Sequence, residues 1–245
     1  MLYQAELRSD HRHAVCHARR NRRNSNLARP GARWVAASST ILLVPASLAA
    51  EVKRAFTHPV APVPAALRGE VDRVLFTGPQ LARRVRTLAR RIEHDFTGRD
   101  LVIVSLLNGT VMFLADLVRH LDLPLRLDFM GVSSYRNGTE SRELVFTKEL
   151  RLDVRGRDVL LVDDILDTGK TLRHVTSKLR ELGPRELKIC VLLDKPARRV
   201  EDLRADYVGF EIPDLFVVGY GLDYAERYRN LPFVGVLKPE MYSQP

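Results

Sequence analysis

The sequence of 245 residues has little cysteine and no long uninterrupted apolar run. Its two cysteines, Cys16 and Cys190, lie far apart, and Cys190 stands inside the apolar run 189–193, where a buried free thiol is expected. A disulfide framework is therefore not expected, and a reducing, cytoplasmic compartment fits the composition. No stretch reaches the roughly 20 apolar residues that a membrane helix needs, so no membrane partner is expected.

Acidic residues are scarce in the first fifty positions, which hold eight arginines but only Glu6 and Asp10. Six charges of the net +9 therefore belong to this segment. Residues 1–68 mix arginine, alanine and proline without periodicity, which predicts a disordered basic extension before a folded domain at 69–245. Residues 34–50 imitate a secretory signal, but the charged region before them is unusually long. A disordered extension, or an N-terminus assigned too far upstream, is the favoured alternative.

A helix is predicted at residues 79–94. Thr77 has the position of an N-cap and Gln80 that of its capping-box partner, with proline in the first turn. Apolar residues then recur at helical spacing as far as Phe96. The other face carries five arginines, and a solvated helix face is favoured there over a nucleic-acid surface, so no nucleic-acid partner is expected.

From residue 101 onward the pattern changes to short apolar runs separated by helical or turn segments. Several runs are apolar throughout, which is typical of a parallel sheet covered on both faces. An α/β fold is therefore predicted. The expected strands are 101–106, 124–130, 144–146, 158–162, 187–193, 207–210, 216–219 and 233–237, and the expected helices are 111–120 and 172–182.

The segment Val159–Thr171 (VLLVDDILDTGKT) carries the clearest chemistry. A buried strand runs into Asp163 and Asp164, and a third acidic residue, Asp167, precedes Gly169 and a helix. The carboxyl end of a parallel strand followed by a helix start offers free backbone N–H groups to a phosphate, and glycine allows a close approach. The adjacent carboxylates suit ribose hydroxyls, and they also suit a divalent cation.

The main rival interpretation is the P-loop of nucleotide hydrolases. That pattern needs a glycine five residues before its Gly-Lys pair, where this sequence has Asp164. The P-loop interpretation therefore fails on its own template. An ordinary acidic turn would have to explain three carboxylates within five residues directly after a buried strand.

The same motif closely resembles the phosphoribosyl-diphosphate motif of type I phosphoribosyltransferases, and the resemblance extends from about residue 71 to 242. The family it resembles most is the hypoxanthine-guanine phosphoribosyltransferases. That resemblance implies an α/β domain whose central, mainly parallel sheet is flanked by helices and carries a small hood. Four further segments carry it: LLNGTVMFLADL at 106–117, VSSYRNGT at 132–139, LLDKPARR at 192–199 and VGFEIPDLFVVGYGLDYAERYRNLP at 208–232.

The resemblance also implies a role for individual residues. Asp167 takes the position of the catalytic residue that removes or shares the proton on purine N7. The ribose and 5′-phosphate fall to Asp163, Asp164, Asp167, Thr168, Gly169, Lys170 and Thr171. The residues implied to bind the purine are Lys195, Phe216, Val217 and Leu222, and those implied to bind pyrophosphate are Asn108, Gly109 and Arg229. The magnesium ligand it implies is Asp223, with Asp163 and Asp164 as further candidates. Ser134 and Tyr135 lie in the part that resembles a mobile loop.

Elementary chemistry agrees with these roles. Loss of pyrophosphate leaves positive charge on the sugar and negative charge on the leaving group, so Mg²⁺ and cationic donors at pyrophosphate lower the barrier. A lysine at the 6-oxo group faces another donor when adenine binds, a mismatch worth on the order of a few kcal/mol. Lys195 therefore predicts a preference for 6-oxopurines. Purely structural roles also stay open for these residues: a core position in a strand for Phe216, a surface lysine for Lys195, and ordinary loop charges for Asp223 or Arg229.

The sequence departs from the family at 107–110 (LNGT), where many members have lysine followed by two small residues. Asn108 does not supply that charge, although the family uses this loop largely through its backbone, sometimes with a non-proline cis peptide. The Asp163-Asp164 pair replaces the Glu-Asp of some relatives, a change of one methylene.

Two functions remain at this point. The first is a purine-salvage enzyme that makes inosine or guanosine monophosphate from a base and phosphoribosyl diphosphate. The second is a regulator that binds phosphoribosyl diphosphate on the same fold, which needs neither a proton acceptor nor a purine donor. Asp167, Lys195 and Asp223 favour the enzyme. The family suggests a homodimer or homotetramer, and the sequence does not rank hypoxanthine, guanine and xanthine.

Overall fold

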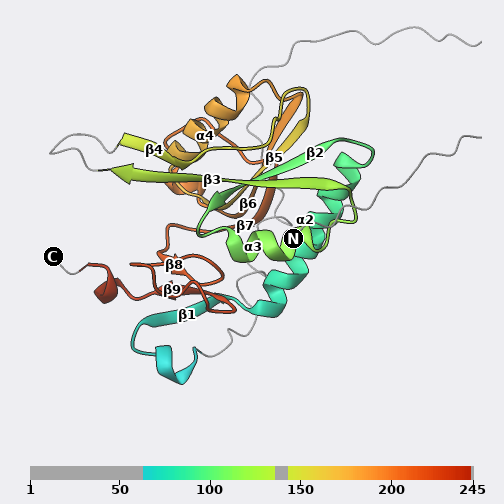
Figure 1. The fold of residues 1–245 in the computed structure, drawn as a ribbon. Helices are drawn as coiled ribbons and strands as arrows, with labels where there is room; N and C mark the ends of the chain where they lie inside the picture. Colours follow the sequence, from blue (N-terminus) through green and yellow to red (C-terminus); the bar gives the residue numbers. More distant parts are fainter. Residues whose placement is uncertain (1–62, 136–142, 244–245) are drawn as a thin grey trace, which may run out of the picture. The chain divides into compact units, whose positions relative to one another are not determined.

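The computed structural model describes residues 63–135 and 143–243, which form two β-sheets and their helices (Figure 1). The larger sheet has the strand order β4-β3-β2-β5-β6-β7, and the smaller has the order β1-β9-β8. The strands are β1 (Val71–Phe76), β2 (Leu101–Leu107), β3 (Leu125–Tyr135), β4 (Glu143–Lys148), β5 (Asp158–Leu166), β6 (Glu186–Asp194), β7 (Tyr207–Glu211), β8 (Val217–Val218) and β9 (Val234–Leu237). The helices are α2 (Gly78–Phe96), α3 (Val111–Val118) and α4 (Lys170–Glu181), with 3-10 turns η1 (Ala65–Leu67), η2 (Pro196–Arg198) and η3 (Pro239–Met241).

The larger sheet is parallel except for its edge strand β4, which pairs antiparallel with β3. Alternate residues of β2 enter different cores: Ile103 packs with α2 and α3, whereas Val102 and Val104 pack with α4. The inner strands are apolar throughout because helices cover both faces. The predicted α/β fold with a mainly parallel sheet is confirmed.

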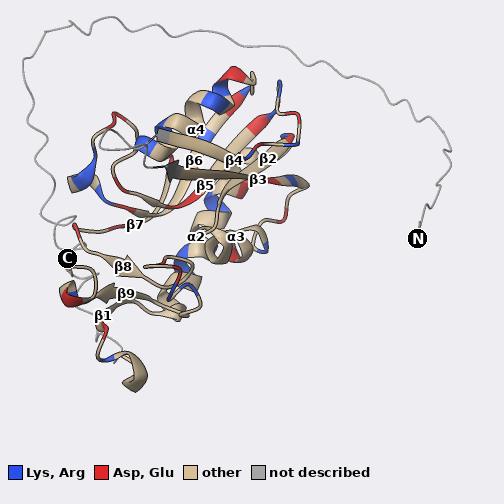
Figure 2. Cartoon of the chain, turned by 60° about the vertical axis from the view of Figure 1, so that its left-hand side comes forward, with Lys and Arg blue, Asp and Glu red and all other residues tan. Residues whose placement is uncertain are grey.

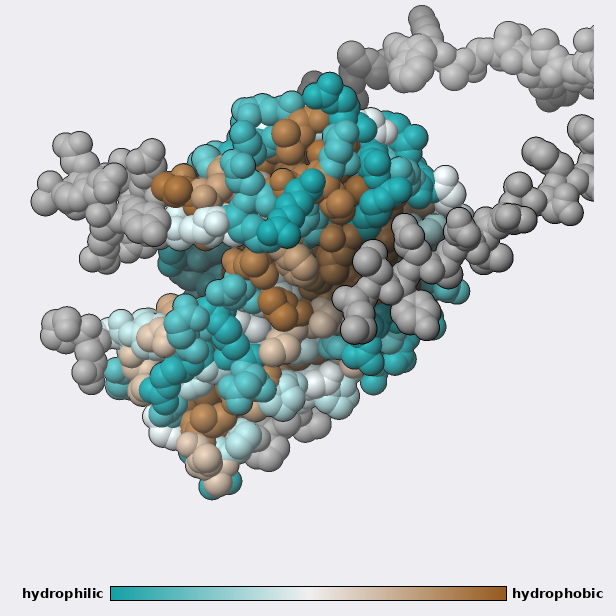
Figure 3. Space-filling model, viewed as in Figure 1, coloured by the Kyte–Doolittle hydropathy of each residue, from teal (hydrophilic) through white to brown (hydrophobic). Residues whose placement is uncertain are grey.

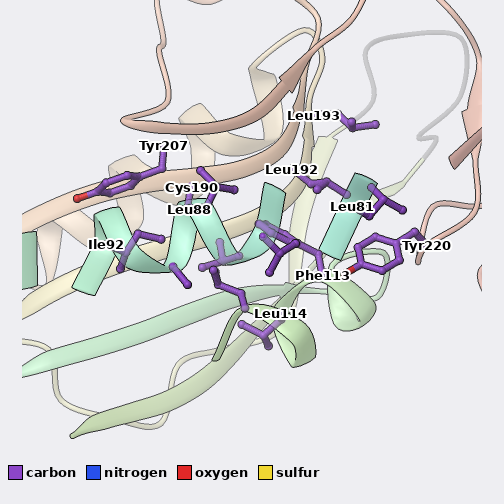
Figure 4. Close-up of a cluster of buried hydrophobic side chains, with 14 of the residues drawn as sticks. Leu81, Leu88, Ile92, Phe113, Leu114, Cys190, Leu192, Leu193, Tyr207 and Tyr220 are labelled. Carbon is purple, nitrogen blue, oxygen red and sulfur yellow. The ribbon is translucent and has the colours of Figure 1, made fainter. Parts of the chain in front are cut away.

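Helix α2 begins with the predicted capping box. The backbone N–H of Thr77 donates to Oε1 of Gln80 over 2.8 Å, and the backbone N–H of Gln80 donates to Oγ1 of Thr77 over 3.4 Å. This satisfies two polar groups that a helix start leaves without partners. Figure 4 shows its apolar face in the core, where Leu88 and Ile92 lie among side chains of α3, β6 and β7.

The smaller sheet, called the hood below, is built from both ends of the domain. β1 pairs antiparallel with β9, and β9 with β8. No strand was predicted at β1, because its sequence (VDRVLF) leaves two neighbouring charged residues exposed and breaks the alternation that marks a strand. Its pairing with a strand more than 150 residues away supplies the order that the local pattern lacks.

Most predicted elements are present with shifted ends. β5 continues past the predicted end at Val162, because Ile165 and Leu166 still pair with Leu193 and Asp194 of β6. Asp163 and Asp164 thus belong to the strand itself. Phe216 lies just before the two-residue strand β8 and not within it.

The surface carries charges of both signs, with Lys and Arg on α4 among other places (Figure 2). Figure 3 shows hydrophobic residues concentrated toward the middle of one face and hydrophilic residues around them. In the described ranges 63–135 and 143–243, no helix is both long and apolar enough to cross a membrane. The stretch at 34–50 that imitates a secretory signal and most of the predicted 1–68 extension lie outside these ranges.

Candidate active site

The site lies at the carboxyl ends of β2 and β5, the two strands at the centre of the larger sheet. A cavity of about 450 Å³ opens there. Its walls come from the end of β2 and the connection to α3 (106–110), from Val132 of β3, from the end of β5 through the start of α4, and from Asp223 and Arg229 beyond β8. Parallel sheets place ligand sites at this edge because the strand ends and helix starts converge there.

The turn into α4 is shaped for an anion. Gly169 is the N-cap and has a left-handed backbone with φ of 87°. A Cβ at this position would lie 3.1 Å from Cβ of Glu201 and 3.2 Å from Cδ of Arg199, so a larger residue is both strained and crowded. Thr168, Gly169 and Thr171 line the cavity at this turn, and a helix start leaves its first N–H groups without partners inside the helix.

The carboxylate of Asp163 is almost inaccessible to solvent, with 8% of the residue exposed. Oγ1 of Thr110 donates to its Oδ1 over 3.0 Å, and the N–H of Asp164 donates to the same oxygen over 3.0 Å. Burial raises the pKa of Asp163 well above its ordinary value, and the neighbouring Asp164 carboxylate raises it further. Burial also raises the pKa of Asp164, although Arg229 acts against this rise. The pair therefore favours a cation or hydroxyl donors beside it.

Arg229 lies between β8 and β9 in sequence and lines the same cavity as this carboxylate pair. Its Nη1 lies 2.9 Å from Oδ1 of Asp223 and donates to the carbonyl oxygen of Gly221 over 2.9 Å. The peptide bond between Leu107 and Asn108 is cis, as in some members of the family named above. A Cβ on Gly109 would overlap Oδ2 of Asp164 and come within 3.7 Å of Nη1 of Arg229. The pyrophosphate candidates Gly109 and Arg229 thus meet at Asp164.

Lys195 lies just after β6, with 6% of the residue exposed. Its backbone N–H donates to the carbonyl oxygen of Leu166 over 3.0 Å, so the lysine is tied to the turn that carries Asp167. Burial lowers the pKa of Lys195, while the carboxylates of Asp167 and Asp214 raise it. Nζ lies 4.0 Å from Oδ1 of Asp214.

The cavity brings together part of the predicted set. It is lined by Asn108, Gly109, Asp163, Asp164, Asp167, Thr168, Gly169, Thr171, Asp223 and Arg229. It is not lined by the phosphate-turn residue Lys170 or by the purine candidates Lys195, Phe216, Val217 and Leu222. Phe216 has 36% of its surface exposed, whereas Val217 and Leu222 are buried. Lys195 directly follows β6, Val217 lies in β8 of the hood, and Phe216 and Leu222 lie before and after that strand.

The mobile-loop candidates Ser134 and Tyr135 end strand β3, where their backbones pair with Leu144 and Glu143 of β4. Residues 136–142, which join the two strands, lie outside the described ranges. The role of Ser134 and Tyr135 stays a prediction.

The predicted magnesium ligands do not form one cluster. Among the described residues, no three His, Cys, Asp or Glu side chains are close enough to hold a metal ion. Asp223 is paired with Arg229, while Asp163 and Asp164 stand side by side in the cavity. Two neighbouring carboxylates with raised pKa values, one buried and one half-buried, suit Mg²⁺, which typically takes one or two protein carboxylates and completes its shell with substrate oxygens and water.

Four residues near the site were not assigned from the sequence: Thr110, Arg198, Asp214 and Tyr242. Thr110, Arg198 and Asp214 stand inside segments that carried the family resemblance, but their types alone do not single them out. Arg198 lies 3.1 Å from Asp167, and Tyr242 stacks on Phe216. These contacts join segments far apart in sequence, so no local signal marks them.

Comparisons with known proteins agree with this geometry. The phosphoribosyl transferase domain matches residues 74–225, more than half of the chain. The chain is 44% identical over 177 residues to the hypoxanthine-guanine phosphoribosyltransferase of Bacillus subtilis, which covers 72% of this chain and 98% of that protein. It is 44% identical to a crystal structure of a hypoxanthine phosphoribosyltransferase from Staphylococcus aureus, with a TM-score of 0.70 over 75% of this chain and all of that one.

The chain also matches the bifunctional protein TilS/HprT of Listeria monocytogenes, at 45% identity over 179 residues and 73% of this chain. It spans only 28% of the length of that protein. Fold, site and matches define the class: the chain belongs to the phosphoribosyl transferase domain family. Within this class it belongs to the hypoxanthine-guanine phosphoribosyltransferases, which act in purine salvage.

Proposed function

We propose that this protein transfers the 5-phosphoribosyl group of phosphoribosyl diphosphate to N9 of hypoxanthine or guanine, with Mg²⁺, giving IMP or GMP and pyrophosphate. One observation carries the proposal. The neighbouring carboxylates of the buried Asp163 and the half-buried Asp164, the turn at Gly169 and the pyrophosphate candidate Arg229 line a single cavity of about 450 Å³. A phosphorylated sugar with a second charged group fits such a cavity.

The phosphoribosyl half is held at the end of β5. The 5′-phosphate accepts hydrogen bonds from the backbone of the turn at 167–171 and benefits from the positive end of α4. The hydroxyls of Thr168 and Thr171 donate to the same phosphate, and Lys170 adds charge beside it. Asp163 and Asp164 accept hydrogen bonds from the ribose hydroxyls, which offsets the free-energy cost of keeping these carboxylates ionised away from water.

The leaving group is held at the opposite wall. The backbone of Asn108 and Gly109 donates to pyrophosphate, and Arg229 turns from Asp223 to meet its developing negative charge. Asp163, Asp164 and Asp223 are the residues that would hold Mg²⁺ together with substrate oxygens. When bound, the metal supplies positive charge at the departing pyrophosphate.

The base is held beyond Asp167. Phe216 stacks on the purine, Lys195 donates to its 6-oxo group, and the backbone of Val217 and the buried Leu222 border its edge. Asp167 accepts or shares the proton on N7 as N9 attacks the sugar. A proton acceptor next to a 6-oxo donor is what an enzyme needs and what a regulator of the same fold does not need.

A direct assay tests the proposal. Purified protein is incubated with magnesium, phosphoribosyl diphosphate and, in separate reactions, hypoxanthine, guanine, xanthine or adenine. Nucleotide and pyrophosphate are expected with hypoxanthine or guanine and very little with adenine. If no base gives a nucleotide, while the protein still binds phosphoribosyl diphosphate, the regulator is the correct interpretation.

The remaining partners follow from the same proposal. Small-molecule substrates are the partners of the site, with no nucleic-acid or membrane partner, and the enzyme works in the cytoplasm as a homodimer or homotetramer. Ser134 and Tyr135 belong to a loop that closes over the site and keeps water from the activated ribose. Native mass measurement tests the assembly.

A further inference from the structure

Two neighbouring arginines hold Asp167 in different ways. Arg199 is largely buried, and its Nε donates to the backbone carbonyl of Asp167 over 3.1 Å; its other nitrogens bond Asp194 and the carbonyl of Leu203. Arg198 is half-exposed, and its Nε lies 3.1 Å from Oδ1 of the Asp167 carboxylate. Arg199 therefore fixes the main chain of Asp167, whereas Arg198 faces its side chain.

The contact between Arg198 and Asp167 is a charge contact without hydrogen-bond geometry. Oδ1 of Asp167 is buried, and among the described residues it accepts no hydrogen bond. A buried carboxylate oxygen without a donor is costly, and a nearby guanidinium offsets that cost without fixing a direction. The carboxylate is thus held at one oxygen and can still adjust when a base arrives.

Asp214 extends this contact into a chain of alternating charges. Its Oδ1 lies 3.7 Å from Nη1 of Arg198 and 4.0 Å from Nζ of Lys195. The order is Asp167, Arg198, Asp214 and Lys195, with the two groups proposed to touch the purine at its ends. Asp214 stands two residues before Phe216, so the chain also reaches the segment that carries the stacking ring.

We propose that Arg198 and Asp214 are positioning residues of the transfer reaction, with Arg198 orienting the Asp167 carboxylate toward N7 and Asp214 holding Arg198 and Lys195 at the spacing that a 6-oxopurine requires. This inference rests on the proposed function, because it assigns the proton transfer to Asp167. The side chains of Arg198 and Asp214 are 46% and 54% exposed, so their ion pair adds little to stability. Substitutions there leave the fold intact and report on turnover.

The test compares steady-state kcat and KM with hypoxanthine for the native protein, Arg198→Met, Arg198→Lys, Asp167→Asn and the double variant. Arg204→Met is the matched control, since Arg204 is exposed and forms no ion pair with any described residue. Arg198→Met is expected to lower kcat roughly tenfold and to leave KM for phosphoribosyl diphosphate unchanged. Arg198→Lys restores part of the loss. Asp214→Asn is expected to lower kcat about threefold, the effect that corresponds to the loss of one exposed ion pair.

The double variant decides how Arg198 acts. In the Asp167→Asn background, Arg198→Met is expected to cause no further loss of kcat, because its effect passes through the carboxylate. A further, independent loss would overturn the positioning role, and so would a native kcat for Arg198→Met. If Asp167→Asn itself keeps full turnover, the proposed role of Asp167 fails, and this inference fails with it. If Asp167→Asn lowers kcat but Arg198→Met does not, the positioning role of Arg198 is overturned and the proposed function still stands.

Discussion

The ring of Tyr242 stacks on the ring of Phe216, with centroids 4.6 Å apart and planes inclined by 19°. Tyr224 meets the same phenylalanine edge-on, at 5.6 Å and 87°. Phe216 is therefore held by two aromatic neighbours before any base binds, and a purine has one ring face left to occupy. Such pairs contribute about 0.5–1.5 kcal/mol beyond the area they bury.

From this relationship, Tyr242→Ala is expected to raise KM for hypoxanthine about threefold to tenfold, because the stacking ring loses its support. KM for phosphoribosyl diphosphate should stay unchanged, since that substrate binds at the other end of the site. Tyr242→Phe keeps the ring and serves as the control. Steady-state kinetics with each substrate varied in turn make the measurement, and equal KM values for native protein and Tyr242→Ala would rule out the support.

Lys195→Ala is expected to erode the preference for 6-oxopurines. Removal of the donor is expected to lower kcat/KM for hypoxanthine about tenfold to a hundredfold, because its 6-oxo group loses a hydrogen-bond donor. It should not lower kcat/KM for adenine, whose 6-amino group faces a mismatched donor in the native protein. The ratio of kcat/KM for the two bases is the measurement, and Lys178→Ala on the outer side of α4 is the control. An unchanged ratio would contradict the role given to Lys195.

Gly109→Ala is expected to disable phosphoribosyl-diphosphate binding. An added Cβ would overlap Oδ2 of Asp164, so the carboxylate would have to leave the position in the cavity from which it is proposed to bind the ribose. KM for phosphoribosyl diphosphate should rise at least tenfold while the unfolding temperature changes little. Gly69→Ala is the matched control, because a Cβ there has nothing within 4 Å. Native kinetics in Gly109→Ala would place pyrophosphate elsewhere.

Asp128 predicts the acid sensitivity of the fold. Burial raises its pKa, but backbone N–H groups of Leu152, Phe129 and Arg151 and the ammonium of Lys148 outweigh burial and lower the pKa to about 2. Because the folded pKa lies below the ordinary value of 3.8, the stabilisation is complete above that value and is lost as pH falls toward 2.

Asp128→Asn should therefore lower the free energy of unfolding by about 1–3 kcal/mol at pH 7, since an amide has one acceptor oxygen and adds donors facing donors. The difference from the native protein should shrink between pH 4 and pH 2. Urea unfolding across this range measures it, with the exposed Asp202→Asn as control. A constant difference at all pH values would mean that ionisation of Asp128 does not stabilise the fold.

Local patterns were sufficient for most of the larger sheet. Continuous apolar runs such as β2 require cover on both faces, and the capping box at Thr77 and Gln80 marks a helix start through contacts within four residues. β1 was missed because its partner, β9, lies at the other end of the domain. The extent of β5 was also underestimated, since its last pairs depend on β6.

The site divides in the same way. The sequence alone determined the carboxylates and the turn at 163–171, because a strand, two acids and a glycine before a helix are neighbours in the chain and their chemistry is local. Only the tertiary structure decided that Arg229 lies near enough to Asp164 to act on its charge, that Arg198 faces Asp167 and that Tyr242 stacks on Phe216. These contacts join side chains from separate segments, and their distances follow from packing of the sheet, its helices and the hood. No spacing along the chain encodes them.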